Sequence, residues 1–380
     1  MKYHHRVIES SLKEYLEAFP VVGITGPRQS GKSTLLQASL PSYQYITFDD
    51  YNVIKMFNDD PVQFMATYSD KVIFDEAQKA PALFDLVKLS VDKDRQNYGK
   101  YVLTGSSQFS FVKGITESLA GRMGTLCLLP YQFTEIPEEL RDEAIYRGSY
   151  PEIVNREYAY SQNWYDAYME TYIERDVRSL TNIGNLTDFR HFINLLAANT
   201  ATTLNMSNYA NDLNVNVGTI KNWISVLEAS YVIFLVQPYF NNFGKRIIKS
   251  PKVYFYDTGL VAYLTGLKTK ELYERGPLKG RLFENYIVSE ILKKEYHYKT
   301  NGKLYYFRTS HGVEVDLIID YKTHRTLIEI KSSMTFRRKN LTPIESIIEK
   351  NDTGYLLYQG VYTPFSDNIK IVNYKDYLSE

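Results

Sequence analysis

A glycine-rich stretch between an apolar run and a helix-like run constrains the fold of this chain most. It reads GPRQSGKST over residues 26–34, and Gly26, Gly31, Lys32 and Ser33 satisfy the pattern G-x-x-x-x-G-K-[ST]. VVGIT precedes it and STLLQASL follows it, which is the strand-then-helix placement that a phosphate-binding loop requires. The stretch therefore predicts such a loop, and a glycine-rich turn with an accidental lysine is the weaker alternative.

Each residue type in a loop of this kind has a chemical role. The glycines let backbone N–H groups face phosphate oxygens at the positive end of a helix. We expect Lys32 to reach the β and γ oxygens of ATP and the Ser33 hydroxyl to bind Mg²⁺. The candidate nucleotide-binding segment consists of Gly26, Pro27, Arg28, Gln29, Ser30, Gly31, Lys32, Ser33 and Thr34.

Short apolar runs alternate with helix-like stretches around this loop. Such alternation predicts an α/β fold with a parallel, doubly wound sheet, the architecture of the P-loop NTPases. The expected strands are residues 21–25, 43–50, 71–78, 100–107 and 124–130.

Two adjacent carboxylates, Asp75 and Glu76, end the expected strand KVIFDEAQ. An aspartate at the end of an apolar strand suits the water shell of Mg²⁺, and the neighbouring glutamate can polarise an attacking water. Because water as the nucleophile means hydrolysis, the pair favours an ATPase over a small-molecule kinase. An acidic strand end that faces solvent is the alternative.

Two further stretches supply candidates for the same site. Ser106, in TGSS, follows a buried strand and is a candidate sensor of the γ-phosphate, with a helix cap as the alternative. Arg122, in LAGRMG, is a candidate catalytic arginine finger that acts in its own chain or in a neighbouring subunit. A surface salt bridge is the alternative for Arg122.

The pattern of expected helices and strands changes twice along the chain, which predicts three domains. Residues 1–150 form the nucleotide-binding domain, residues 151–275 a mainly helical region, and residues 276–380 a small α/β domain.

The middle region contains a segment that reads as helix, turn, helix and then strands, the order of a winged helix-turn-helix. The second helix has an apolar stripe and leaves Lys221 as a cation on its outer, polar face. This pattern is typical of a DNA-binding element, with packing between domains as the alternative. The cations that follow, beside the expected wing, raise the support for DNA binding: Lys245, Arg246, Lys249 and Lys252.

The third region contains a second group of charged residues. Strand alternation places Glu329 and Lys331 on one face of TLIEIKSS, and Glu314 and Asp316 on one face of VEVDLIID. Glu284 is in line with apolar residues on the preceding helix, so its carboxylate occupies a face that otherwise reads as buried, and a buried carboxylate needs a cation. A surface pair and a chance triad are the alternatives.

Nearly the whole chain resembles a large prokaryotic family of AAA+-type ATPases. Its members join an N-terminal ATPase domain to a C-terminal region of unknown function. The resemblance implies ATP binding by the Walker A residues of the loop and by the Walker B residues Asp75 and Glu76. It rests on the following stretches in this order: GPRQSGKST, VIFDEAQKAP, LTGSS, LAGR, YIERDV, SPKVYFYDTGL, GRLFEN, EVDLII and IEIKSS.

The charged group of the third region resembles the core of restriction-endonuclease-like nucleases. That resemblance implies a second Mg²⁺ bound by Asp316 and Glu329, with Glu284 completing the shell. Lys331 would orient or activate the attacking water. A nuclease-like fold does not by itself imply cleavage.

Composition narrows the classes of function further. Lysine plus arginine and aspartate plus glutamate both number 44, so any contact with DNA must come from local patches. The single cysteine, Cys127, excludes an internal disulfide. The strongest apolar run, YVIFLVQP, is shorter than the roughly 18 residues that span a bilayer. We expect a cytoplasmic protein without a membrane association.

These patterns predict an ATP-hydrolysing protein that requires Mg²⁺ and couples hydrolysis to the binding or processing of duplex or branched DNA. The alternative is an ATP-operated regulatory switch that binds a protein partner and carries an inert nuclease-like domain. A homo-oligomer is a further expected form of assembly.

Overall fold

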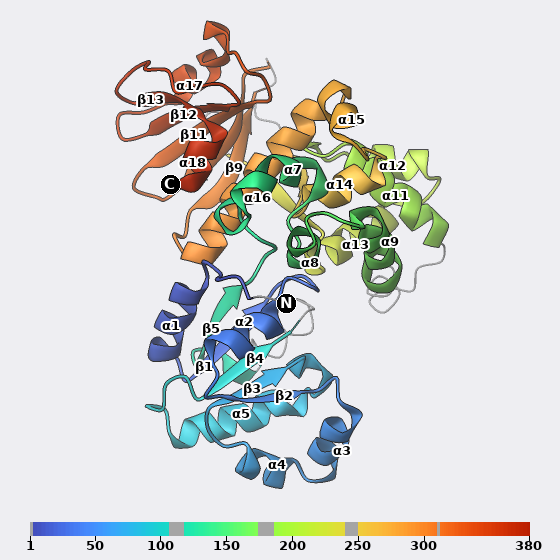
Figure 1. Cartoon of the computed structure of the whole chain (residues 1–380), viewed down its shortest axis with the longest axis vertical. Coiled ribbons are helices and arrows are strands. Elements are labelled where there is room, and N and C mark those ends of the chain that lie inside the picture. The colour runs from blue at the N-terminus through green and yellow to red at the C-terminus, as the bar shows by residue number, and fades with distance from the viewer. Residues whose placement is uncertain (1–2, 106–117, 174–185, 240–249, 310–311) are drawn as a thin grey trace. The chain divides into compact units, whose positions relative to one another are not determined.

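The computed structural model describes residues 3–105, 118–173, 186–239, 250–309 and 312–380 (Figure 1). Contacts divide the chain into two compact units, each with its own sheet. Unit 1 comprises Met1–Tyr131, Ala229–Tyr231 and Tyr296–Lys299. Unit 2 comprises Gln132–Glu228, Val232–Glu295 and Thr300–Glu380, so it holds both the middle region and the third region of the sequence.

Unit 1 contains a five-stranded sheet in the order β2-β3-β4-β1-β5, and every neighbouring pair is parallel. Parallel strands require crossovers, and described helices supply those between the first four strands along the chain. The predicted parallel α/β sheet is therefore confirmed. The strands are β1 (Val21–Thr25), β2 (Gln44–Thr47), β3 (Val72–Asp75), β4 (Tyr101–Thr104) and β5 (Met123–Cys127).

Two helices of unit 1, α3 and α4, begin directly after aspartates that cap them. The Asp50 carboxylate accepts a hydrogen bond from Asn52 N at 2.8 Å, and Asp60 accepts one from Gln63 N at 2.9 Å ahead of Pro61. These contacts satisfy N–H groups that have no partner inside a helix. The elements are α1 (Glu9–Ala18), α2 (Lys32–Ser39), α3 (Tyr51–Asp59), α4 (Pro61–Thr67), η1 (Ala77–Lys79) and α5 (Ala82–Lys93).

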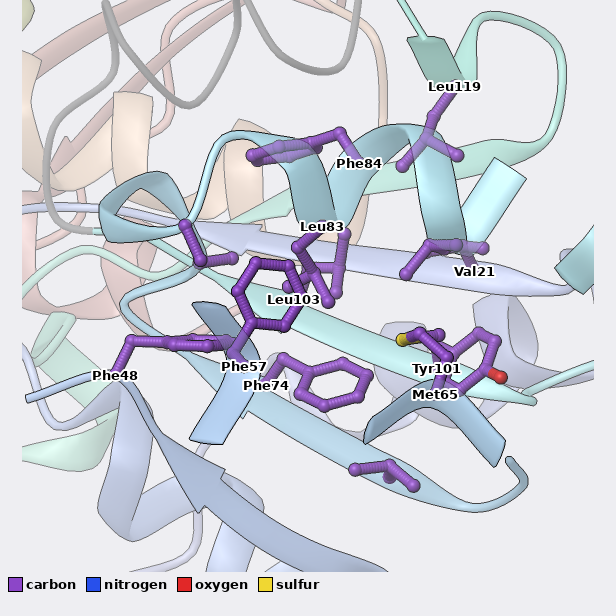
Figure 2. Packing of buried hydrophobic residues seen from close by; sticks show 14 of the residues in the cluster. Val21, Phe48, Phe57, Met65, Phe74, Leu83, Phe84, Tyr101, Leu103 and Leu119 are labelled. Carbon is purple, nitrogen blue, oxygen red and sulfur yellow. The ribbon is translucent and has the colours of Figure 1, made fainter. Parts of the chain in front are cut away.

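Alternation along the strands of unit 1 divides its core between the two faces of the sheet. Val21 packs on one face with aromatic residues from α3, α4 and the neighbouring strands, whereas Val22 packs on the other with residues of α1 and α2. Figure 2 shows the first face, where the Phe48 ring centroid lies 5.6 Å from that of Phe57 and 6.1 Å from that of Phe74. Helices on both faces fix the strand ends, and with them the loop after β1.

Unit 2 contains an eight-stranded mixed sheet in the order β13-β12-β11-β10-β9-β7-β8-β6. The parallel pair β7–β9 joins strands of the middle region to strands of the third region. The strands are β6 (Thr202–Thr203), β7 (Ile233–Pro238), β8 (Lys252–Phe255), β9 (Lys303–Arg308), β10 (Glu314–Asp320), β11 (Arg325–Lys331), β12 (Thr353–Tyr358) and β13 (Ile369–Asn373).

The helices of unit 2 include one that continues past its boundary, because the last residues of α16 belong to unit 1. The α-helices are α7 (Arg141–Arg147), α8 (Pro151–Asn155), α9 (Ser161–Tyr168), α11 (Leu186–Ala198), α12 (Met206–Asp212), α13 (Val217–Ala229), α14 (Thr258–Leu264), α15 (Lys270–Arg275), α16 (Lys279–Tyr298), α17 (Thr342–Ile347) and α18 (Tyr374–Ser379). Short 3-10 turns are η3 (Phe133–Glu135), η4 (Glu138–Leu140) and η6 (Arg338–Asn340), and η5 (Met169–Ile173) is a π-helical turn.

In the middle region the order is α11, β6, α12, α13, β7 and β8, and β8 pairs antiparallel with both β6 and β7. Ile220, Trp223 and Leu227 of α13 are buried, whereas Lys221 and Ser225 are exposed. The stripe on this helix therefore faces the interior as predicted.

No helix in the described part of the chain has both the length and the apolar character that a membrane crossing needs. The thiol of Cys127 is buried. Burial raises its pKa to about 11, so it has little thiolate character at neutral pH.

Candidate functional site

The loop after β1 adopts a backbone that depends on glycine. Gly26 has φ 140° and Gly31 has φ 92°, and a Cβ built on Gly26 would lie 2.1 Å from the backbone oxygen of Leu128. A side chain at Gly26 would therefore require both a strained backbone and movement of the strand end beside it. Gln29 also adopts a positive φ, of 60°. Residues 26–31 thus form a tight turn that leads directly into α2.

The Lys32 side chain turns back over this loop. Its Nζ donates hydrogen bonds to the carbonyl oxygens of Gly26 at 3.0 Å and Pro27 at 2.8 Å, and no described carboxylate forms an ion pair with it. Burial lowers the pKa of the Lys32 ammonium to about 8, although the charges of Glu76 and Asp75 oppose this shift. A buried ammonium with only neutral carbonyl partners among the described residues is suited to an anionic ligand.

Asp75, at the end of β3, is the centre of a hydrogen-bond network beside the loop. Its Oδ2 accepts from Ser33 Oγ at 3.0 Å and from the Tyr45 hydroxyl, and its Oδ1 accepts from Thr104 Oγ1. The structure thus brings together the two residues expected to hold Mg²⁺, from α2 and β3. Oxygen ligands of this kind are what Mg²⁺ prefers.

Glu76 follows Asp75 in a left-handed conformation with φ 54°. Its backbone N–H donates to Thr104 Oγ1 at 3.3 Å, and its carboxylate accepts from the Gln78 amide. A left-handed backbone at a glutamate is uncommon, and here it directs the chain away from β3 as soon as that strand ends. Glu76 therefore lies at the same sheet edge as the loop, where an attacking water would have to be held.

One buried polar atom, Ser30 Oγ, indicates that this centre fits a phosphate ligand. Ser30 Oγ is buried and has no hydrogen-bond partner among the described residues. An unpaired buried hydroxyl costs free energy unless a ligand or water completes it. The loop backbone, Lys32 and Ser30 therefore fit a phosphate, and Ser33 with Asp75 would hold the Mg²⁺ that accompanies it.

Several residues of this centre were not predicted from the sequence. The guanidinium of Arg6 is buried and donates to Ser30 O at 2.9 Å and to Leu129 O at 2.8 Å. Arg6 precedes α1 in the sequence, and it supports the loop through the backbone carbonyl of Ser30. Tyr45 carried no signal beyond its place in β2. Thr104 lies in the predicted TGSS stretch, and it contacts Asp75.

Two predicted site residues are not placed at this centre. Ser106 lies outside the described residues. Arg122 precedes β5, and Val21 N at the start of β1 donates to its carbonyl at 3.4 Å, so it lies at the sheet edge opposite the loop. Five strand residues, about 16 Å, separate these edges. The Arg122 guanidinium instead forms two bonds to Asp92, at 2.7 Å and 3.0 Å. The geometry excludes an arginine finger within the same chain, and a role in a neighbouring chain stays a prediction.

The charged residues of the third region do come together in unit 2. Lys331 Nζ lies 2.7 Å from Glu329 Oε1 and 3.6 Å from Asp316 Oδ2. Asp316 Oδ2 also accepts from the backbone N–H of Ile330 at 2.8 Å. Glu284 of α16 is linked to the same group by Lys252, which was predicted to lie beside a wing.

Lys252 is the first residue of β8. Its Nζ lies 2.9 Å from Glu284 Oε1, 2.7 Å from Glu314 Oε1 and 4.0 Å from Asp316 Oδ1. The interpretation of Lys252 as a DNA-facing cation beside a wing is therefore wrong, because its side chain is buried among carboxylates. The sequence feature that could have indicated this burial is the apolar run VYFY, which directly follows Lys252. The other expected wing cations lie outside the described residues.

Electrostatics in this group favour a fixed positive charge. Burial alone lowers the pKa of the Lys252 ammonium, but the charges of Glu284, Asp316 and Glu314 more than reverse this, and its pKa lies well above the ordinary value. Burial and the neighbouring Asp316 raise the pKa of Glu329 to about 8, although Lys331 opposes the shift. Within the described residues, no group of three or more histidine, cysteine or carboxylate side chains is arranged to hold a metal ion.

Three family models match consecutive parts of the chain. An AAA domain matches residues 18–137, and two domains of unknown function, DUF8612 and DUF4143, match residues 138–271 and 279–377. The first match contains the glycine-rich loop and the Asp75–Glu76 pair, whereas the carboxylates of unit 2 lie in the third.

Among curated proteins, an uncharacterised protein of Mycobacterium tuberculosis and one of Mycobacterium bovis are each 29% identical over 337 residues. The alignment covers 88% of this chain and 75% of each relative.

Solved structures give weaker similarities. A Walker-type ATPase of Pyrococcus abyssi is 15% identical with a TM-score of 0.46, over 68% of this chain and 94% of that one. AMPPCP-bound DnaA of Aquifex aeolicus is 11% identical with a TM-score of 0.31, over 58% of this chain and 86% of that one. Loop geometry and the family match identify residues 18–137 as a P-loop ATPase domain of the AAA type, followed by a C-terminal domain that is uncharacterised.

Proposed function

We propose that this chain binds Mg·ATP at the loop of unit 1, hydrolyses it, and couples hydrolysis to the binding or processing of DNA by unit 2. The observation that carries the first part is the hydrogen bond of 3.0 Å between Ser33 Oγ and Asp75 Oδ2 beside the buried Lys32. A phosphate-side hydroxyl and a strand-end carboxylate in contact are the oxygen ligands that a nucleotide-bound Mg²⁺ needs.

In this proposal each residue has a defined step. Lys32 releases the carbonyl oxygens of Gly26 and Pro27 and bonds the phosphate oxygens, where its charge stabilises the transferred phosphoryl group. Ser33 and Asp75 would hold Mg²⁺, which would supply positive charge to the phosphates. Glu76 accepts a proton from the attacking water, so the products are ADP and phosphate.

The DNA part of the proposal is supported by the element order in unit 2. The helices α11, α12 and α13 with β6, β7 and β8 follow the order of a winged helix-turn-helix, and β8 pairs with both other strands. Lys221, Asn222 and Ser225 of α13 are exposed, so they are available for contact with a phosphate backbone.

A second candidate, an ATP-operated switch that binds a protein, is favoured by the charge of the same helix. Lys221 is its one cation, whereas a helix that reads DNA normally brings several contacts to phosphates. A face that is polar with little charge also suits a protein surface.

The test measures phosphate release from Mg·ATP with no DNA and with single-stranded, duplex or branched DNA. Lys32→Ala measures any contaminating activity. We expect one DNA form to raise wild-type turnover several-fold, and Lys221→Glu to reduce that stimulation and its dependence on salt. Lys370→Glu, at an exposed lysine of β13 in the same unit, is the matched charge control.

Each result separates the two parts of the proposal. Turnover that requires Lys32 but responds to no DNA form removes the DNA part and favours the protein-binding switch. Phosphate release that persists in Lys32→Ala removes the assignment of hydrolysis to this loop.

A further inference from the structure

Four carboxylates of unit 2 form the carboxylate cluster: Glu284, Glu314, Asp316 and Glu329. Glu284 comes from α16, the next two come from β10, and Glu329 comes from β11. The resemblance to nuclease cores predicts Mg²⁺ among three of them. Whether their oxygens are free to bind such an ion decides between a nuclease and an inert domain.

The ammonium group of Lys252 lies among these oxygens. It forms ion pairs with Glu284 and Glu314 at 2.9 Å and 2.7 Å, and its third carboxylate neighbour, Asp316, is at 4.0 Å. The Tyr306 ring centroid lies 5.4 Å from Nζ. With a side chain only 2% exposed, Lys252 places its ammonium between Glu284 of α16 and Glu314 of β10, beside Asp316.

Other groups also bind oxygens of the cluster. Glu284 Oε1 accepts a second hydrogen bond from the Tyr254 hydroxyl at 2.8 Å, and Asp316 Oδ2 accepts one from Ile330 N. Glu329 Oε1 is paired with Lys331. Glu329 Oε2 is buried without a hydrogen-bond partner among the described residues.

We propose that Lys252 is the resident cation of the carboxylate cluster, that it excludes a divalent metal from this centre, and that unit 2 does not cleave DNA. An ammonium and a divalent ion cannot share the same oxygens, because each repels the other at contact distance. Unit 2 then acts by binding, which deepens the proposed function by removing nucleolysis from it. The proposal does not require that DNA is the ligand or that ATP hydrolysis occurs.

The first experiment titrates Mn²⁺ into the full chain without nucleotide and measures free Mn²⁺ by electron paramagnetic resonance. A Ser33→Ala background removes the hydroxyl ligand at the phosphate loop. We expect no stoichiometric Mn²⁺ site in this chain, and no difference when Asp316→Asn is added. One equivalent of Mn²⁺ that is bound with Lys252 present and lost in Asp316→Asn would overturn the proposal.

The second experiment removes the lysine. In Lys252→Met the carboxylates lose their ammonium, so we expect a gained Mn²⁺ site at least about tenfold tighter than any binding in the parent, equivalent to 1.4 kcal/mol. Mn²⁺ should raise the melting temperature of this variant and leave that of the parent unchanged. A folded Lys252→Met chain that gains no site would overturn the exclusion of metal by this lysine. If Lys252→Met does not fold without Mn²⁺, refolding it in the presence of Mn²⁺ allows the same measurement of bound metal. The first experiment does not depend on any Lys252 variant.

A third measurement addresses cleavage directly. Wild-type chain with Mg²⁺ or Mn²⁺ should leave duplex, single-stranded and branched DNA intact over hours. Cleavage that disappears in both Asp316→Asn and Lys331→Ala would contradict the proposal. This outcome is independent of phosphate release from ATP, so failure here and failure of the proposed function are distinguishable.

Discussion

Unit 1 and unit 2 each bury a lysine at a charged centre, but they give its charge different partners. Lys32 is 7% exposed and bonds two neutral carbonyl oxygens of its own loop. Lys252 is 2% exposed and bonds carboxylates from two other elements. The protein thus pairs the charge of Lys252 with its own carboxylates and leaves that of Lys32 for a ligand.

Their pKa values shift in opposite directions for this reason. Burial dominates at Lys32 and lowers its pKa to about 8, whereas at Lys252 the neighbouring carboxylates outweigh burial and raise it. A buried lysine is therefore evidence for a ligand site only when its partners inside the protein are neutral.

The largest expected difference between the two lysines is in stability, measured after Lys252 is replaced. Lys252→Met leaves two partly buried carboxylates, Glu284 and Glu314, without their cation, so we expect a loss of up to about 3–5 kcal/mol in the free energy of unfolding. Urea denaturation followed by circular dichroism measures it, with Lys370→Met at an exposed site as the control. A loss within the error of that control would mean that water, and not Lys252, compensates the cluster.

The same substitution in unit 1 should act on turnover and spare stability. In Lys32→Met we expect ATP turnover to fall by about 10²–10³-fold, because a charge aimed at the transferred phosphoryl group is lost. The free energy of unfolding should stay the same or rise, since a buried charge without a carboxylate partner is removed. A variant that is both inactive and strongly destabilised would show that Lys32 also holds the fold.

The lowered pKa of Lys32 predicts a dependence of ATP affinity on pH. In the free protein the ammonium is protonated below about pH 8, and phosphate binds the protonated form. Affinity should therefore be full below pH 8 and should fall as pH rises above it, by up to about tenfold per unit. Isothermal titration calorimetry in two buffers of different ionisation enthalpy should detect proton uptake on binding at pH 8.5 or so. Lys32→Arg, which stays protonated, is the control, and a persistent pH effect in it would assign the dependence to another group.

The smallest effect is expected at Arg122. Because its guanidinium is bound to Asp92 at the sheet edge away from the loop, Arg122→Ala should leave turnover per chain in dilute solution unchanged within about twofold. Turnover measured over a range of protein concentrations checks this. If the variant loses activity only at high concentration, the arginine acts on the site of a neighbouring chain.

Local patterns in the sequence predicted much of unit 1. VVGIT became β1 with the predicted bounds, and the loop, α2 and the Asp75–Glu76 strand end follow from residues close together in the chain. Such features depend on backbone geometry that neighbouring residues determine. The grouping of Asp316, Glu329 and Lys331 also followed from strand alternation.

The partners of these residues could not be predicted, because they come from distant parts of the chain. Alternation assigns a residue to a face of a strand but does not identify what lies opposite it. Lys252 meets Glu284 across 32 residues, and Arg6 meets Leu129 across 123. The last strand and helix, β13 and α18, were also missed.

The position of Arg6 has a practical consequence for handling the protein. Its guanidinium supports the carbonyl of Ser30 from a segment that precedes the first helix. Trimming the chain to begin at α1, or fusing a bulky affinity tag directly ahead of Arg6, would loosen the phosphate loop without changing any residue that we propose to bind nucleotide. Recombinant preparations that differ only at this terminus would then differ in ATP affinity, and a tag at the opposite end is the safer choice for measuring it.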